Sequence, residues 1–204
     1  MPEKHAKRGR IGRPPSKTAD SHSTIIDAVH FLLQQTSVRD LTMEAIAKRA
    51  GVGKPTLYKW WPSKTALVLA MFHERLAGEP MATKARTAEA SIRERARHLI
   101  AALNGPFGKV MAELVAEGQS DPAVLQELCE RHIEPRRAAA LLDLERGKSN
   151  GEIAPGADTE LILEEIFGAI YYRMLLRSGP LTEEYADKVV DQVFKGLRLA
   201  KSRG

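Results

Sequence analysis

The fold is decided by the stretch AIAKRAGVGKPTLYKWWPSK, Ala45–Lys64, in which two short helical patterns meet at a glycine turn. Before the turn, Ile46 and Ala47 lie on one helical face and the cationic residues lie on the other. Gly51 can take the left-handed backbone conformation that ends a helix within one residue. Pro55 suits the first turn of the next helix, because it needs no amide partner and its φ is already set. The stretch therefore predicts two short helices joined by a sharp turn.

The flanking residues indicate where these helices begin and end. Thr42 is positioned to cap the first helix, Pro62 ends the second, and Ser63 caps a further helix. The small side chain of Ala47 lies opposite the turn and lets the two helices approach each other. The pattern predicts a helix-turn-helix motif over residues 42–61, in which the second helix enters the major groove of DNA.

Apolar residues at three- and four-residue spacings also predict a preceding helix from Ser21, with Ser21 or Ser23 as its N-cap. We expect residues 20–66 to form a DNA-binding domain of three helices. The fourth helix, from Lys64 to Ala77, would then join it to a larger regulatory and dimerisation domain over residues 67–204.

Basic residues are concentrated at the front of the chain. Residues 1–64 carry 12 Lys and Arg against 5 Asp and Glu, a net charge of +7, whereas residues 65–204 carry 19 against 21, a net charge of −2. This asymmetry indicates that the N-terminal part meets a polyanion.

Residues 1–19 are too basic and too poor in large apolar residues to fold on their own, so we expect a disordered arm. Two interpretations of this arm stay open. It is either a solvated tail or a segment that lies along the DNA minor groove, where Arg10 and Arg13 would make the contacts. The Gly-Arg-Pro sequence of residues 12–14 resembles the core of an AT-hook.

The longer stretch LTMEAIAKRAGVGKPTLYKWWPSKTALV, Leu41–Val68, resembles the DNA-binding domain of the TetR family of bacterial transcriptional regulators. The match includes the threonine-capped helix, the Ala-Gly-Val turn, the Pro-Thr-Leu-Tyr helix and the Ser-Lys start of the next helix. The resemblance implies DNA-binding roles for a set of residues on or beside the second helix: Thr42, Lys54, Pro55, Thr56, Tyr58, Lys59, Trp60 and Lys64.

Within that set, the resemblance assigns different roles. Thr42 and Tyr58 would hold phosphates, residues 54–56 would face the bases, and Lys64 would meet the DNA backbone. Trp60 departs from the family pattern, which often has a second basic residue there. It either stacks on a sugar or a thymine methyl group or simply packs, while Trp61 is expected to pack in the core or hinge.

The remainder of the chain contains only helical patterns, so the predicted fold class is all-α. Pro135 would either kink one long helix or divide two. The C-terminal segment from Gly151 to Phe194 resembles TetR regulatory domains more loosely. The expected helices cover residues 88–103, 107–116, 122–132, 135–149, 159–177 and 183–199.

The last two predicted helices carry more apolar residues than one protomer can cover. Paired with a second copy, they would form a four-helix bundle. The resulting homodimer would place two recognition helices about one DNA turn apart and bind a palindromic operator. The residues expected at this interface are Ile166, Gly168, Ile170, Val189, Val193, Phe194 and Leu197.

The resemblance also implies a small-molecule pocket in the C-terminal domain. Candidate pocket residues are apolar or phenolic: Phe107, Met111, Leu114, Tyr171, Tyr172 and Met174. The alternative is that each of them is an ordinary core residue.

Other classes of function find little support in the sequence. The six histidines lack metal-ligand spacing, no phosphate-binding loop is present, and His132 with its acidic neighbours suggests a solvated helix face, so we expect neither a metal, a cofactor nor catalysis. The single Cys129 is expected to pack as a small hydrophobe in a protein of the reducing cytoplasm. No apolar run is long enough to span a membrane.

The sequence therefore predicts a transcriptional regulator, with repression as the family's commoner mode and a small-molecule effector that releases the DNA. The alternative is a DNA-binding protein that acts architecturally without an effector.

Overall fold

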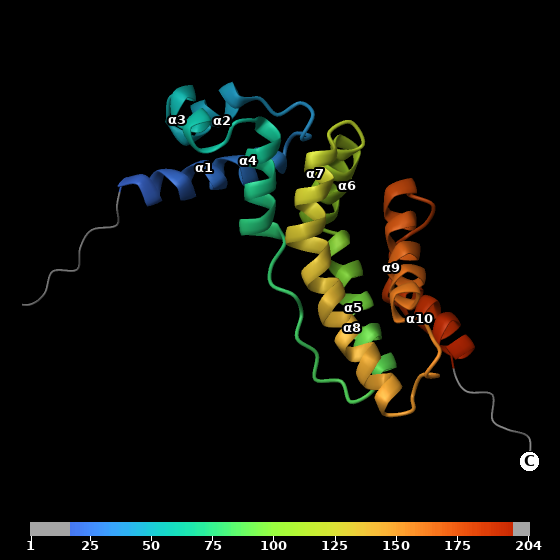
Figure 1. Ribbon diagram of the computed structural model, residues 1–204. Helices are drawn as coiled ribbons and strands as arrows, with labels where there is room; N and C mark the ends of the chain where they lie inside the picture. The colour runs from blue at the N-terminus through green and yellow to red at the C-terminus, as the bar shows by residue number, and fades with distance from the viewer. Residues whose placement is uncertain (1–16, 198–204) are drawn as a thin grey trace, which may run out of the picture.

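The computed structural model describes residues 17–197, and every regular element within that range is helical (Figure 1). This confirms the all-α prediction. A small N-terminal domain lies at one end of a longer helical domain, and the buried apolar residues of the two form one continuous core.

The N-terminal domain consists of four helices around a compact apolar centre. Ile46, Leu57 and Leu67, each from a different helix, have no exposed surface. The helices are α1 (Lys17–Leu33), α2 (Met43–Ala50), α3 (Lys54–Trp60) and α4 (Lys64–Met71).

The helix ends follow the capping residues in the sequence. The Thr42 hydroxyl accepts a hydrogen bond from the Ala45 amide at 3.1 Å, and the Ser63 hydroxyl accepts one from the Ala66 amide at 3.1 Å. Gly51 ends α2 with a φ of +68°, in the left-handed region that favours glycine. These three predictions are confirmed.

The first helix differs from its prediction. It begins at Lys17, four residues before Ser21, so neither Ser21 nor Ser23 is its N-cap. The Thr-Ala-Asp sequence at residues 18–20 contains neither glycine nor proline and therefore does not stop the helix from extending.

Helix α4 does not remain an α-helix as far as Ala77. From Phe72 to Leu76 it widens into a π-helical turn, η1, and the chain then leaves the helix at Gly78, whose φ is +57°. A linker over residues 77–87 runs from this point alongside α8 to the start of α5 (Figure 1).

The larger domain has six α-helices and a second π-helical turn. Helices α9 and α10 lie on the side remote from the N-terminal domain (Figure 1). The elements are α5 (Ala88–Leu103), α6 (Pro106–Gly118), α7 (Pro122–Leu128), η2 (Cys129–Ile133), α8 (Glu134–Ser149), α9 (Thr159–Leu176) and α10 (Glu183–Leu197).

Pro135 neither divides the helix nor breaks it. Elements α7, η2 and α8 follow one another without a loop, so the chain is helical from Pro122 to Ser149. Because proline cannot donate a hydrogen bond and its ring crowds the carbonyl four residues earlier, the wider turn of η2 accommodates it.

Helix α6 holds the loop between α1 and α2. Lys109 donates to the carbonyls of Leu33 at 3.1 Å and Thr36 at 2.7 Å, while the Glu113 carboxylate accepts from the amide of Val38. The two domains are therefore joined by these polar contacts as well as by α4.

Among residues 17–197, no single helix is both long and apolar enough to cross a membrane. Only α5 and α6 together reach that length and composition, and they are bent by 85° relative to each other.

Candidate DNA interface and effector cavity

Helix α3 presents a polar and aromatic face to solvent. Leu57 points into the core, whereas Tyr58 is 53% exposed and Trp60 is 40% exposed. Lys54, Pro55 and Lys59 are also exposed, and Thr56 is half-buried. The residues that sequence analysis placed on the recognition helix thus share one surface of the N-terminal domain.

Lys54 has an acidic partner in the absence of DNA. Its Nζ lies 2.5 Å from Oε1 of Glu44 on α2, and both side chains are at least half exposed. The hydrogen bond between them lowers the pKa of Glu44 and raises that of Lys54. Because an exposed pair of this kind contributes little stability, a phosphate or base edge can replace Glu44 at small cost.

Thr42 and Lys64 border the same surface. The Thr42 oxygen caps α2, which leaves its hydroxyl hydrogen free to be donated to a phosphate. Lys64 donates from Nζ to the carbonyl of Arg39 at 2.8 Å, so this cation is held beside the start of α2. Arg10 and Arg13, the predicted minor-groove contacts, lie outside the described residues.

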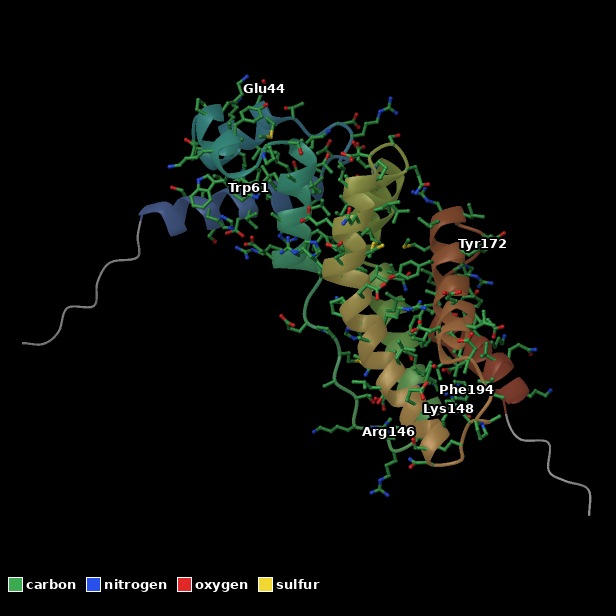
Figure 2. The ribbon with its side chains drawn as sticks, in the orientation of Figure 1. Glu44, Trp61, Arg146, Lys148, Tyr172 and Phe194 are labelled. Carbon is green, nitrogen blue, oxygen red and sulfur yellow. The ribbon has the colours of Figure 1, made fainter. Side chains whose placement is uncertain are left out.

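The two tryptophans have different surroundings. Trp61 is 7% exposed and packs in the core, as predicted (Figure 2). Trp60 meets the ring of His22 edge-on at 5.7 Å between centroids, and His22 in turn lies 2.9 Å from the Glu74 carboxylate. Trp60 therefore packs against His22, although 40% of its surface stays exposed.

A cavity of about 650 Å³ lies between the end of α4, the linker and helices α5, α8 and α9. Most of its lining is apolar, and its polar groups are arginines, histidines, two glutamates and one tyrosine. The lining residues are Leu76, Ala77, Gly78, Glu79, Met81, Arg95, His98, Leu99, Ala102, Phe107, His132, Ile133, Arg136, Arg137, Leu163, Glu164, Phe167, Gly168 and Tyr171.

Two of the three lining arginines are neutralised by carboxylates. Arg95 lies 2.8 Å from the buried Asp143 and also donates to the carbonyl of Met81 at 2.7 Å. Arg137 pairs with Glu160 and Glu164 of α9.

Arg136 is arranged differently. Its guanidinium donates to the backbone carbonyls of Ala77, Gly78 and His132, and it forms no ion pair with a carboxylate of the described residues. Arg136 has no acid three or four residues away, whereas Arg131 has Glu127 at that spacing. Arg95 also lacks an acid at that spacing and yet pairs with Asp143, so helical spacing alone does not single out Arg136.

His132 corrects an expectation from the sequence. It is 1% exposed rather than solvated, and the rings of Phe72 and Phe107 lie 5.2 Å from its own. Burial, reinforced by the nearby Arg136 and His73, lowers its pKa to about 3, so the ring is neutral at physiological pH. Neither ring nitrogen has a hydrogen-bond partner.

Cys129, three residues earlier, is exposed instead of packing as a small hydrophobe. The π-helical turn η2 carries both residues and sends Cys129 toward solvent and His132 toward the core.

The structure brings only part of the predicted pocket together. Phe107 and Tyr171 line the cavity, and burial raises the pKa of the Tyr171 phenol to about 12. Met111 and Leu114 do not line it, because they are completely buried in the core. Tyr172 is 61% exposed on α9, one residue round the helix from Tyr171 (Figure 2), and Met174 packs against the core without reaching the cavity.

The expected dimer face also needs correction. Ile166, Ile170 and Phe194 are buried within the protomer, where α9 and α10 pack on the rest of the domain, so they offer no surface to a second copy. The exposed large apolar residues of α9 are instead Leu161, Tyr172, Leu175 and Leu176.

A shallow groove between α9 and α10 adjoins this face. Val189 and Val193, both predicted at the interface, line the groove together with Ala169. Gly168 is exposed but also borders the cavity of about 650 Å³, and Leu197 is half-buried. Within residues 17–197, no group of three or more His, Cys, Asp or Glu side chains is arranged to hold a metal ion.

Comparison with known proteins identifies the class. Residues 25–71 match the model described as "Bacterial regulatory proteins, tetR family", and residues 82–193 match "Tetracyclin repressor-like, C-terminal domain". The second match alone covers more than half of the chain. The chain therefore belongs to the TetR family of helix-turn-helix transcriptional regulators.

Individual relatives span nearly the whole chain. The HTH-type transcriptional regulator YdeS of Bacillus subtilis is 31% identical over 191 residues, which cover 94% of this chain and 96% of that protein. The TetR regulator SCO0332 has a crystal structure that matches with a TM-score of 0.66 and 27% identity over 88% of this chain and all of that one. FadR of B. subtilis, solved in complex with stearoyl-CoA, shares the fold with a TM-score of 0.69 and 21% identity over 87% of this chain and all of its own.

Proposed function

We propose that this regulator binds a palindromic operator as a homodimer, represses transcription there, and releases the DNA when a small molecule enters the cavity. The observation that carries the proposal is the position of the cavity. One wall is formed by residues 76–79, where α4 ends and the linker begins. A molecule in the cavity therefore touches the element that connects the two domains.

The exposed face of α3 supports the operator-binding part of the proposal. Lys54, Thr56 and Tyr58 offer a cation, a hydroxyl and a phenol on one surface, which suits phosphates and base edges. The N-terminus of α4, with Lys64 beside it, adds free amide groups and the positive end of a helix dipole.

The exposed apolar residues of α9 support the homodimer. Leu161, Tyr172 and Leu176 are each at least half exposed, and monomers rarely expose an apolar stripe of this kind. A second copy packed in a two-fold arrangement would cover the stripe and form a four-helix bundle from two pairs of α9 and α10.

Control would follow from movement of α4. A ligand that fits the cavity better when α4 is tilted would shift both recognition helices, which must otherwise fit two grooves on one side of the DNA. The size of the effect is limited by the difference between the ligand's affinities for the two shapes. The stearoyl-CoA complex of FadR is compatible with an effector in a domain of this fold.

Selection of bound fragments from the genomic DNA of the source organism tests the proposal. The expected result is one enriched inverted repeat, bound by a dimer in light scattering and released by at least one small molecule. Binding without sequence preference would contradict operator recognition. Specific binding that no molecule in a broad metabolite collection alters would support an effector-independent regulator instead. Because the protein would act on chromosomal DNA, we propose that it works in the cytoplasm.

A further inference from the structure

Among residues 17–197, Arg136 is the cavity-lining arginine that forms no salt bridge with a carboxylate. Arg136 donates from Nη2 to the carbonyls of Ala77 and Gly78, the latter at 2.6 Å, and from Nη1 to the carbonyl of His132 at 3.0 Å. Burial lowers the pKa of its guanidinium, although not enough to remove the charge. The charge of Glu79, which also lines the cavity, raises the pKa of Arg136, but Glu79 is exposed and forms no ion pair with it among the described residues.

His132 gives a second and independent observation. This side chain lines the same cavity with 1% of its surface exposed, yet both of its ring nitrogens lack a partner. Buried polar groups in proteins are nearly always hydrogen-bonded. Both nitrogens are buried as the ring stands, so the imidazole would have to rotate toward the cavity for one of them to meet a ligand. A neutral imidazole has one N–H to donate and one nitrogen that accepts.

The remaining lining describes the other part of such a ligand. Leu76, Leu99, Phe107, Leu163 and Phe167 provide an apolar surface without charge. A cavity of about 650 Å³ falls within the range of typical small-molecule sites. The cavity lining therefore has a polar part, with an arginine that has no ion pair and an unpaired imidazole, and a larger apolar part.

We propose that the effector is an apolar molecule with a single anionic headgroup, a carboxylate or a phosphate, and that Arg136 binds this headgroup in exchange for the carbonyls of Ala77 and Gly78. The inference rests on the proposed control of DNA binding and specifies its ligand and its trigger. Guanidinium recognises both headgroups through paired hydrogen bonds, and rotation of the His132 ring toward the cavity would add an N–H donor to the anion.

The exchange explains how occupancy reaches the DNA-binding domain. Ala77 and Gly78 directly follow the π-helical turn η1, so the guanidinium of Arg136 fastens the end of α4 to α8. When an anion takes those donors, the carbonyls lose their partner and α4 is free to tilt. Ligand binding and the fastened position of α4 therefore exclude each other.

Matched ligand pairs test the headgroup. Isothermal titration of the full-length protein would use straight-chain acids of six to twelve carbons and two aryl acids, 4-phenylbutyrate and 1-naphthylacetate. Each acid would be compared with its primary amide and its amine, and the alkyl chains also with their alkyl phosphates. At least one acid or phosphate should bind roughly tenfold or more tightly than its amide, as expected for a charge-assisted hydrogen-bonded pair. If no anion in the series exceeds its amide, or if none binds, the proposal is wrong.

Variants of Arg136 test the residue. Arg136→Met should remove the preference for the anion over the amide, and Arg136→Lys should retain part of it, because the charge remains without the planar fork. Arg131→Met is the matched control, since the exposed Arg131 lies on the same helical segment, pairs with the half-buried Glu127 and does not line the cavity. Far-UV circular dichroism and melting curves establish that each variant is folded. An unchanged preference in folded Arg136→Met would overturn the assignment.

Operator binding separates this inference from the proposed function. In the wild type, the tightest anion should weaken operator affinity by tenfold or more, whereas Arg136→Met should bind the operator with an affinity that the anion does not change. If neutral molecules release the operator and anions do not, ligand control stands and the anionic headgroup is refuted. If the wild type recognises no operator, the proposed function fails regardless of what binds the cavity.

Discussion

The contribution of the buried ion pair between Arg95 and Asp143 to the stability of the larger domain can be tested with a single substitution. The two side chains are 11% and 9% exposed, with 2.8 Å between Arg95 Nη2 and Asp143 Oδ2, and the buried hydroxyl of Ser91 donates to the same carboxylate. Asp143→Ala would leave the Arg95 guanidinium buried with only backbone carbonyls as partners. We expect a loss of about 3–5 kcal/mol in the free energy of unfolding, the usual cost of removing one member of a buried pair.

Urea unfolding followed by far-UV circular dichroism at fixed protein concentration measures this loss. In thermal scans it corresponds to roughly 6–20 °C, at about 2–4 °C per kcal/mol for a chain of this size. The matched control is Glu184→Ala. Glu184 pairs with Lys188 at 2.6 Å but both side chains are more than 70% exposed, so the change should stay within about 0.5 kcal/mol.

The double variant Asp143→Ala with Arg95→Met sharpens the test. Because it removes the uncompensated charge as well, it should be more stable than Asp143→Ala alone. A single-variant loss below about 1 kcal/mol, or a double variant less stable than the single one, would refute the reasoning that a buried charge sets the cost.

Three further predictions concern DNA, the dimer and pH. Tyr58→Ala should weaken binding to all operator variants alike, whereas Thr56→Ala should relax the base preference at one position. Each change should cost roughly 1–3 kcal/mol of binding free energy, measured by fluorescence anisotropy, and unchanged affinities would contradict the assigned docking. Leu176→Glu should shift the protein toward monomers in light scattering at micromolar concentration, whereas Leu142→Glu, at an exposed leucine of α8, should not. Equal behaviour of the two variants would argue against the exposed face of α9 as the dimer interface. The pKa of His132 is about 3 in the folded state against an ordinary 6.5, so the unfolded chain binds the extra proton between these values. The free energy of unfolding should therefore fall as pH drops from 6.5 toward 3, by up to about 1.4 kcal/mol per pH unit. His132→Phe should remove this contribution, and an unchanged pH profile would contradict it.

The sequence predicted those features that depend on neighbouring residues. Thr42, Gly51 and Ser63 act through hydrogen bonds or backbone angles within four residues, so their roles follow from local chemistry alone. The recognition helix was predicted for the same reason, because Pro55 and Leu57 define its start and its inward face without any distant partner.

Predictions failed where the outcome depends on how helices rotate against one another. Tyr171 and Tyr172 are adjacent and about 100° apart around α9, so a small error in rotation decides which one meets the cavity. Ile166 and Ile170 are apolar, as interface residues often are, but they lie in the core. Only the packing of α9 against the rest of the domain distinguishes a core position from an interface position.

His132 shows the limit of polarity as a guide. Its neighbours in sequence are charged, yet Phe72 and Phe107, distant in sequence, enclose its ring. The π-helical turn that carries it also shifts the helical register, which a period of 3.6 residues does not anticipate. The role of Arg136 could not be found from the sequence, because Arg95 also lacks an acid three or four residues away and is paired with Asp143 only by the packing of two helices.

The most direct test of the account is a calorimetric titration of the tightest-binding acid with and without saturating operator DNA. If occupancy of the cavity controls the recognition helices, one coupling free energy links the two sites, and such coupling is reciprocal. If the acid weakens operator binding 100-fold, about 2.7 kcal/mol per complex, the operator must weaken binding of the acid by the same factor. Equal affinity for the acid in the two titrations would show that the cavity does not control DNA binding and would contradict the account.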